Sequence, residues 1–350
     1  MLVRTGSAWL GGRYATDVVD VTSDLDALNS TGWWAVVVTY EGEVTCARFR
    51  RVITLSDQNE LRQHLGRNQW SPPDENSWAS SLDKNMYQAQ VEEIRLGISR
   101  GDFYQVNLCR VLSTPLPAPS QKISPLVPAF EISRTHPAPF VGAIDLPALA
   151  RPVQIATASP ELFLRRNRSE IHSAPIKGTA DNARALSQKD AAENIMIVDL
   201  VRNDFSRVCD AATVVADELL EVQHHPGLVH LVSHVKGRLN VKAGWAEIFE
   251  ATFPPGSVTG APKIAAMQAI ARLEPVPRGP YCGAIGWVDA DTQQAELAVG
   301  IRTFYIDEDQ LKFGTGAGIT YSSNAEAEWR ETELKASRLI SLASRSSQAA

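Results

Sequence analysis

The sequence predicts an α+β fold in which two antiparallel sheets pack together and are flanked by helices. Strand-like and helix-like segments follow one another irregularly, without the regular βα repeat of a doubly wound fold. Several strand-like segments are consecutive, as in an antiparallel meander. Hydrophobic residues make up 44% of the 350 residues and charged residues 21%, which is typical of a globular protein with a sizeable core.

The N-terminal region, residues 1–80, is predicted to be β-rich, with a strand at Trp33–Tyr40. A polar stretch with two prolines ends this region, and we place a boundary there. A second region, residues 83–342, is predicted to begin with a helix. Asp83 is its expected N-cap, and Gly101 is the expected stop.

The second region is predicted to combine meander strands with helices. Four strand-like segments lie within residues 140–178, and a long helix follows at about 187–203. Two shorter helices are expected near residues 243–252 and 262–273, and a final helix from about Ala325. Three strands with hairpin-type breaks separate the last two helices.

Composition excludes several classes of function. The net charge of −6, with 34 basic and 40 acidic residues, argues against a nucleic-acid partner. The sequence has no apolar stretch of the length of a membrane helix or a signal peptide, so we expect a cytoplasmic protein with no membrane partner. The four cysteines are far apart and are expected to be free thiols. They are Cys46, Cys109, Cys209 and Cys282.

The predicted final helix carries two carboxylates on one edge. At 100° per residue, Glu328, Glu331 and Lys335 fall within about 60° of arc. Two glutamates three residues apart repel each other, and a divalent cation would offset that repulsion. The alternative is a solvated face with a salt bridge from Glu331 to Lys335.

Glu193 lies in an otherwise apolar run of the predicted long helix. A carboxylate on an apolar face needs a partner. A metal shared with the final helix would supply one, and a nearby lysine or arginine would serve equally well.

The segment Phe253–Ile270 is a glycine-rich loop that runs into a helix, with Pro262 in the first turn. It departs from the phosphate-binding spacing, because Gly260 and Lys263 are separated by two residues and no serine or threonine follows the lysine. ATP binding by this loop is therefore not expected.

Other candidate positions are ambiguous by themselves. Gly316 and Gly318 serve either in a tight turn or in the close approach of a substrate carboxylate. Arg302 is suited to bidentate carboxylate binding, and the alternative is a surface salt bridge. His230 is either catalytic or a structural histidine.

Ten segments, in this order, resemble the chorismate-utilising enzymes, which include anthranilate synthase, aminodeoxychorismate synthase, isochorismate synthase and salicylate synthase. The resemblance covers about Asp83 to Leu342 and implies the fold of that family, with an N-terminal region shorter than usual. The segments are GDFYQVNLCR, SPELFL, PIKGT, AENIMIVDLVRND, VHLVS, FPPGSVTGAPK, YCGAIGW, GIRTF, GAGI and EAEWRETELK.

The resemblance assigns roles to individual residues. Glu193 and Glu331, with Glu328 beside them, correspond to the carboxylates that hold Mg²⁺, which in turn holds the ring carboxylate of chorismate. His230 matches the active-site histidine of the family. The substrate-binding positions are Gly178, Thr179, Tyr281, Arg302, Gly316, Ala317, Gly318 and Lys335.

Two positions indicate which member the chain resembles most. Anthranilate synthases carry alanine where this chain has Lys177, and the lysine is similar to that of aminodeoxychorismate synthase component I. Isochorismate and salicylate synthases carry lysine at the position of Gln105. The resemblance therefore favours amination of chorismate at C4, with amination at C2 as the alternative.

The corresponding mechanism needs two groups with opposite pKa shifts. Glu161 protonates the departing C4 hydroxyl while the Lys177 amine attacks C2, and ammonia then adds at C4 and expels the lysine. Lys177 must be neutral and Glu161 protonated. The alternative is that Lys177 is only an electrostatic contact to chorismate.

Ammonia is expected from a separate glutamine amidotransferase subunit, because the chain has no G-x-C-x-G nucleophile motif. The resemblance implies that the product, 4-amino-4-deoxychorismate, is converted by another enzyme to 4-aminobenzoate for folate synthesis. A non-catalytic chorismate-binding subunit is a further alternative, which retention of the four residues Glu161, Lys177, Glu193 and Glu331 argues against.

Overall fold

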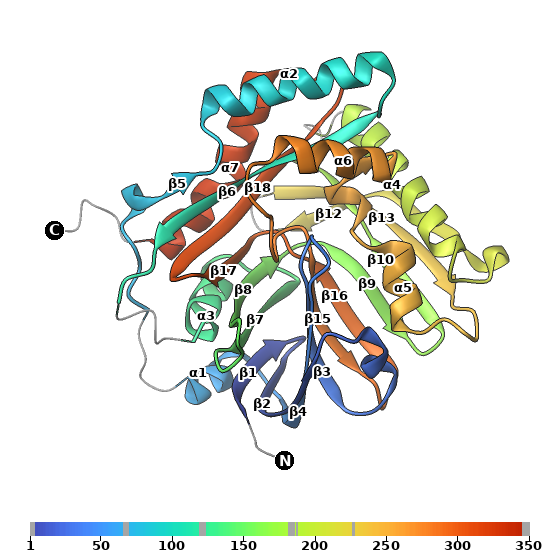
Figure 1. Ribbon diagram of the computed structural model, residues 1–350. Coiled ribbons are helices and arrows are strands. Elements are labelled where there is room, and N and C mark those ends of the chain that lie inside the picture. The colour runs from blue at the N-terminus through green and yellow to red at the C-terminus, as the bar shows by residue number, and fades with distance from the viewer. Residues whose placement is uncertain are drawn as a thin grey trace.

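The structure is a computed structural model, and it describes residues 4–65, 70–118, 124–180, 186, 188–225 and 228–344. Within these residues, 18 strands are hydrogen-bonded into one continuous network, and every strand pairing in it is antiparallel. Helices cover the network from outside (Figure 1). The α+β class is confirmed, and the strands form one folded-over network in place of two separate sheets.

The first four strands belong to the same network as the rest of the chain. They are β1 (Arg4–Leu10), β2 (Arg13–Thr22), β3 (Trp33–Val38) and β4 (Val44–Thr54). β1 pairs with β7 (Phe140–Leu146), and β3 pairs with β15 (Ala284–Asp289). The N-terminal region is therefore β-rich, and these two ladders join its first four strands to the second region.

The remaining elements follow the predicted order with three differences: four strands, not three, separate the last two helices, and a helix at residues 58–64 and a strand at residues 215–225 were not predicted. The strands are β5 (Ala79–Ser80), β6 (Gln105–Pro115), β8 (Val153–Ser159), β9 (Leu162–Asn167), β10 (Glu170–Ala174), β11 (Ile176–Ala180), β12 (Val215–His225), β13 (Leu228–Arg238), β14 (Gly260–Ala261), β16 (Gln294–Val299), β17 (Thr303–Asp307) and β18 (Gln310–Ile319). The helices are α1 (Gln58–His64), α2 (Lys84–Arg100), α3 (Leu126–Thr135), α4 (Gln188–Ser206), α5 (Trp245–Thr252), α6 (Lys263–Leu273) and α7 (Ala325–Ala343).

Both predicted ends of α2 are confirmed. The side chain of Asp83 accepts a hydrogen bond from the backbone N–H of Met86 at 2.8 Å, which satisfies one of the first free N–H groups of the helix. Gly101 ends the helix in the left-handed conformation, with φ of +83°.

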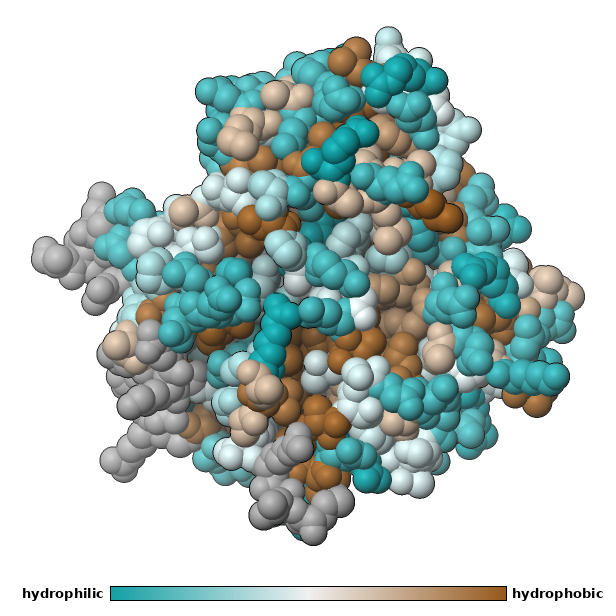
Figure 2. Space-filling view, in the orientation of Figure 1, coloured by the Kyte–Doolittle hydropathy of each residue, from teal (hydrophilic) through white to brown (hydrophobic). Residues whose placement is uncertain are grey.

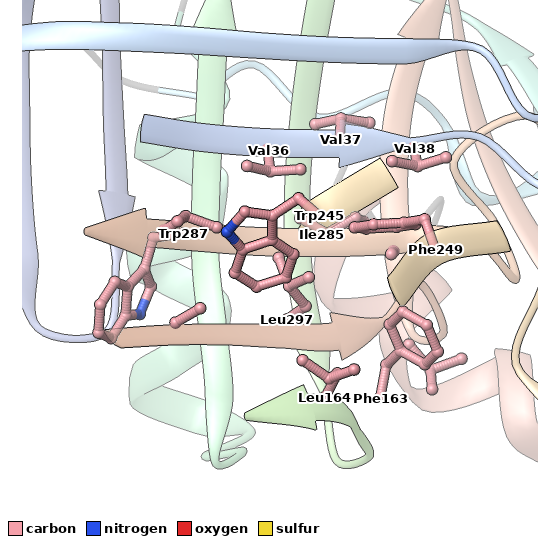
Figure 3. Packing of buried hydrophobic residues seen from close by; sticks show 14 of the residues in the cluster. Val36, Val37, Val38, Phe163, Leu164, Trp245, Phe249, Ile285, Trp287 and Leu297 are labelled. Carbon is pink, nitrogen blue, oxygen red and sulfur yellow. The ribbon is translucent and has the colours of Figure 1, made fainter. Parts of the chain in front are cut away.

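The largest core lies between β3, β15, β16 and β9 and the helix α5. Figure 3 shows Val36 and Val37 of β3 near Ile285, Leu297 and Trp245. All of these side chains are buried. This core fixes the position of β9, and therefore of the segment just before it, in the centre of the molecule.

A smaller core holds the strand pair β6–β18 under α2 and α7, which lie side by side in Figure 1. Tyr87 of α2 makes an edge contact with Trp329 of α7, with ring centroids 5.6 Å apart. Ala317 of β18 is fully buried in this core. The glycines on either side of Ala317 therefore lie in a rigid part of the sheet.

The surface has mixed polarity, with hydrophilic residues over most of the visible face and apolar patches toward its centre (Figure 2). No helix of the described residues is long and apolar enough to cross a membrane. The four cysteines are all buried and free, as predicted.

Candidate active site

Lys177 lies on β11, the short strand that pairs with β13 and packs beside α4. Its amine donates a hydrogen bond to the backbone oxygen of Ser257 at 2.8 Å. Burial lowers the pKa of Lys177, while the negative charges of Glu193 and Glu161 counteract that effect. The lysine is therefore partly desolvated and lies near several acidic groups.

Glu161 lies in the turn between β8 and β9, next to the large core. Its carboxyl is buried, with 4% of the residue exposed. Burial raises the pKa of Glu161 to about 7, although a hydrogen bond with the Ser257 side chain and the charge of Lys177 both lower it. A substantial fraction of Glu161 is therefore protonated at neutral pH.

Ser257 joins these two residues. It lies in the short 3₁₀ turn Gly256–Val258, and its backbone oxygen accepts from Lys177 while its side chain interacts with Glu161. We had not predicted this residue. Ser257 lies in the glycine-rich segment Phe253–Ile270, whose pattern suggested only an anion-binding loop.

The lysine of that glycine-rich segment has a structural role. Lys263 forms a buried ion pair with Asp204 of α4 at 2.6 Å and also donates to the Thr252 oxygen at 3.1 Å. It joins the start of α6 to the end of α4. This pairing agrees with the departure of the segment from the phosphate-binding spacing.

Glu193 projects from α4 toward β6 and β18. Its carboxylate accepts a hydrogen bond from the Gln105 side chain at 3.2 Å. A Cβ atom at Gly318 would lie 2.4 Å from the Gln105 nitrogen, so a larger residue there would displace the Gln105 side chain. The Gln105 side-chain oxygen is buried and has no partner among the described residues, which leaves an acceptor next to Glu193.

The two glutamates of α7 differ in their surroundings. Glu328 is buried and accepts a hydrogen bond from Ser323 at 2.6 Å. Glu331 is more exposed and forms an ion pair with Lys335 at 2.6 Å. The predicted salt bridge between Glu331 and Lys335 is therefore present. Lys335 also donates a hydrogen bond to the backbone oxygen of Gly316 on β18 at 3.1 Å.

The chemistry of these side chains fits Mg²⁺, which prefers oxygen ligands and retains several waters. Three carboxylates and the orphan oxygen of Gln105 supply that kind of donor. In the described residues, however, the oxygens of Glu193, Glu328 and Glu331 do not gather within 4.8 Å of one another. The Mg²⁺ site therefore stays a prediction.

Arg302 has the properties of a carboxylate-binding residue. Burial lowers the pKa of its guanidinium, and no acidic neighbour in the described part of the chain counteracts this shift. Its backbone is in the left-handed region, with φ of +51°. A desolvated guanidinium without an acidic neighbour is a favourable site for an anionic ligand.

Tyr281 and Ala317 contribute little polar surface. The ring of Tyr281 packs beneath Gly314, where a Cβ would lie 2.1 Å from it, and its hydroxyl accepts from the Cys109 thiol at 3.7 Å. Both residues are buried, so the Ala317 side chain belongs to the core. Their substrate-binding roles stay predictions.

Three further positions lie around β11. His230 is buried on β13, where it pairs with Thr179. Gly178 has φ of +78°, and a Cβ there would lie 2.8 Å from Asp190 of α4. The backbone of Thr179 belongs to β11, whereas its side chain lies outside the described part of the structure.

The chain is similar to known proteins in sequence and in fold. Residues 33–341 match the family described as chorismate binding enzyme. The chain is 38% identical to anthranilate synthase component 1 of Saccharolobus solfataricus over 73% of its length, and 32% identical to aminodeoxychorismate synthase component 1 of Escherichia coli over 88%.

The chain spans 61% and 68% of the length of those two relatives. Among solved structures, anthranilate synthase component I of Streptococcus pneumoniae superposes with a TM-score of 0.75 at 24% identity, covering 97% of this chain and 91% of the other. The fold of this chain is therefore similar to that of a solved anthranilate synthase component I. The chain therefore belongs to the chorismate-binding enzyme family.

Proposed function

We propose that the protein is the chorismate-aminating component of an aminodeoxychorismate synthase and forms 4-amino-4-deoxychorismate from chorismate and ammonia. The observation that carries this proposal is the pairing of Lys177 with Glu161 through Ser257. Burial lowers the pKa of the amine and raises that of the carboxyl, so both groups are shifted toward the forms that the reaction needs.

In the first step, the neutral Lys177 amine attacks C2 of the ring. The ring double bonds shift, the C4–O bond breaks, and the hydroxyl leaves as water after it receives the proton of Glu161. The product is a covalent adduct with a bond between C2 and the lysine nitrogen. Ser257 helps to position both groups before the attack.

In the second step, ammonia adds at C4 and the double bonds shift back. The bond between C2 and the lysine nitrogen breaks, which restores Lys177 and gives the 4-amino product. His230 is buried on β13 beside β11 and is proposed as a third catalytic residue, with Lys177 and Glu161.

Chorismate is a dianion, and cationic groups are proposed to hold its carboxylates. Arg302 is proposed to bind one carboxylate. Lys335 of α7, whose amine donates to the Gly316 oxygen of β18, is proposed to bind the substrate together with that backbone. Mg²⁺, held by Glu193, Glu328 and Glu331, would supply positive charge for the ring carboxylate. Gly178 and Thr179, which follow Lys177 on β11, are proposed to contact the substrate through their backbone.

The partner is proposed to be a glutamine amidotransferase subunit that supplies ammonia. The protein is proposed to act in the cytoplasm. The numbering "component 1" in the names of the relatives supports a second component. The product would enter 4-aminobenzoate and folate synthesis.

Anthranilate synthesis, with amination at C2, is the second candidate. The observation that favours it is the 38% identity to an anthranilate synthase component 1. Lys177 distinguishes the two candidates, because a nucleophile that occupies C2 directs ammonia to C4.

The direct test is to incubate the full chain with chorismate, ammonium and Mg²⁺ and to identify the product by mass spectrometry. We expect 4-amino-4-deoxychorismate. Formation of fluorescent anthranilate without an added lyase would contradict the proposal.

The covalent step has its own test. Without ammonium, we expect the Lys177 peptide to gain the mass of chorismate minus one water. Lys177→Ala should abolish both the adduct and turnover, whereas Lys242→Ala, at an exposed lysine, should change neither. Unchanged turnover in folded Lys177→Ala would remove the covalent mechanism.

A further inference from the structure

A second group of ligand-type side chains lies on β12 and β13, apart from the residues assigned above. Glu218, Glu221 and His234 each place one ligand atom within 4.8 Å of the others. The Nε2 atom of His234 lies 3.5 Å from the Glu221 carboxylate and 3.9 Å from that of Glu218. The side chain of His234 is 15% exposed, that of Glu221 47% and that of Glu218 61%, so a small ion can reach all three.

A bulge in β12 produces this arrangement. The register against β13 shifts between Asp217, which faces His234, and Glu221, which faces Val232. Within the bulge, Glu218 and Leu220 have positive φ values of 49° and 58°. The shift brings both carboxylates to the same imidazole.

The bulge is anchored from the opposite side. The backbone N–H of Leu220 donates to the Ser233 hydroxyl at 2.9 Å, and that hydroxyl in turn donates to Asn194 of α4. The anchored backbone holds Glu218 and Glu221 in place without a ligand.

His172 orients the imidazole of His234. Its Nε2 lies 2.8 Å from His234 Nδ1, with the rings stacked at a centroid distance of 5.0 Å. This hydrogen bond holds the His234 ring with its Nε2 atom directed at the two carboxylates. When the Nδ1 atom of His234 is the donor in this bond, Nε2 carries the lone pair that a metal ligand needs.

Gln223 helps to hold Glu221 in this group. Its side-chain nitrogen donates to the Glu221 carboxylate at 2.9 Å and lies 3.5 Å from His234 Nε2.

We propose that Glu218, Glu221 and His234 bind a divalent transition-metal cation of the zinc type. One imidazole nitrogen and two carboxylate oxygens are a ligand set that zinc accepts, with water in the fourth position. A tetrahedral site with bonds of about 2.0–2.1 Å has edges of about 3.3 Å, and the two measured separations need little adjustment to reach that value. His172 is the outer partner that a metal-bound histidine normally has.

The test is calorimetric titration of Zn²⁺ into the full chain at saturating Mg²⁺, with Co²⁺ absorption as a second readout. We expect one Zn²⁺ per chain. His234→Gln and Glu221→Gln should each weaken binding more than about tenfold, and His172→Leu by about 10–100-fold through loss of orientation. Glu131→Gln, at an exposed glutamate on α3, is the matched control and should have no effect.

The double variant Glu328→Gln, Glu331→Gln separates this site from the proposed Mg²⁺ site. It should retain the Zn²⁺ stoichiometry and the Co²⁺ spectrum. Absence of Zn²⁺ binding, or full binding in folded His234→Gln, would overturn the proposal. So would loss of binding in the double variant, because the ion would then occupy the other site.

Discussion

Glu161 and Lys177 have pKa shifts of opposite direction with one cause. Removal from water disfavours the charged form of each group, which raises the pKa of the carboxyl and lowers that of the amine. Their mutual attraction works against this effect in both cases. Removal from water therefore brings the proposed acid and the proposed nucleophile closer to the forms that the reaction would need at the same pH.

The raised pKa of Glu161 predicts a pH dependence of stability. Between pH 4.5 and about 7 the unfolded chain loses this proton while the folded chain keeps it, so the free energy of unfolding falls as pH rises. Glu161→Gln should remove up to about 3 kcal/mol of that fall. Denaturant titrations of both proteins at pH 4.5 and 8 measure the difference, and equal pH profiles would contradict the shift.

Gly318 is predicted to be required for the position of Gln105 beside Glu193. In Gly318→Ala the new Cβ displaces the Gln105 side chain, and we expect the Mg²⁺ concentration for half-maximal activity to rise about tenfold. Gln105→Ala in the same chain removes the clash. If Gly318→Ala is as harmful with Gln105→Ala as without it, the contact is not the cause.

At the scale of elements, α4, α6 and α7 bring the acidic and basic groups to the strands. The start of α6 is held to the end of α4 by Lys263 and Asp204, whose side chains are only 14% and 8% exposed. A buried pair of this kind leaves an uncompensated charge when one partner is lost.

Lys263→Met is therefore predicted to lower the free energy of unfolding by about 3–5 kcal/mol. The control is Lys312→Met, which breaks the pair with Asp307, where the two side chains are 25% and 31% exposed. That change should cost at most about 1 kcal/mol. Chemical denaturation compares the two variants, and equal losses would show that burial of the pair is not what matters.

At the scale of the whole molecule, the N-terminal strands complete the central core. β3 pairs with both β4 and β15, and all six of its residues are buried. The first region and the second therefore share one hydrophobic interior, although the sequence contains a clear polar break near residue 80.

Val37→Asp in β3 is predicted to destabilise the entire chain, because it places a charge in the core between the two regions. We expect a loss of at least about 4 kcal/mol and one cooperative transition. Val241→Asp, at a fully exposed valine, should change stability by no more than about 0.5 kcal/mol. A second region that stays folded in Val37→Asp, as followed by tryptophan fluorescence and circular dichroism, would contradict this coupling.

Local pattern was sufficient for most elements. The Asp83 cap and the Gly101 stop bounded α2, and the apolar periodicity of α7 was visible in the sequence, because such signals depend on residues within a few turns. The motif order was sufficient for the family, which the match over residues 33–341 bears out. The sequence alone thus determined most of the elements, the α+β class and the family.

Tertiary structure decided which side chains meet. Ser257 reaches Lys177 and Glu161 only because the turn before α6 packs against β11, and Gln105 reaches Glu193 only because Gly318 leaves room on β18. The bulge that brings Glu218 to His234 depends on the register of β12 against β13. Contacts of this kind join segments far apart in the chain, and they depend on strand register and packing, which no local pattern encodes.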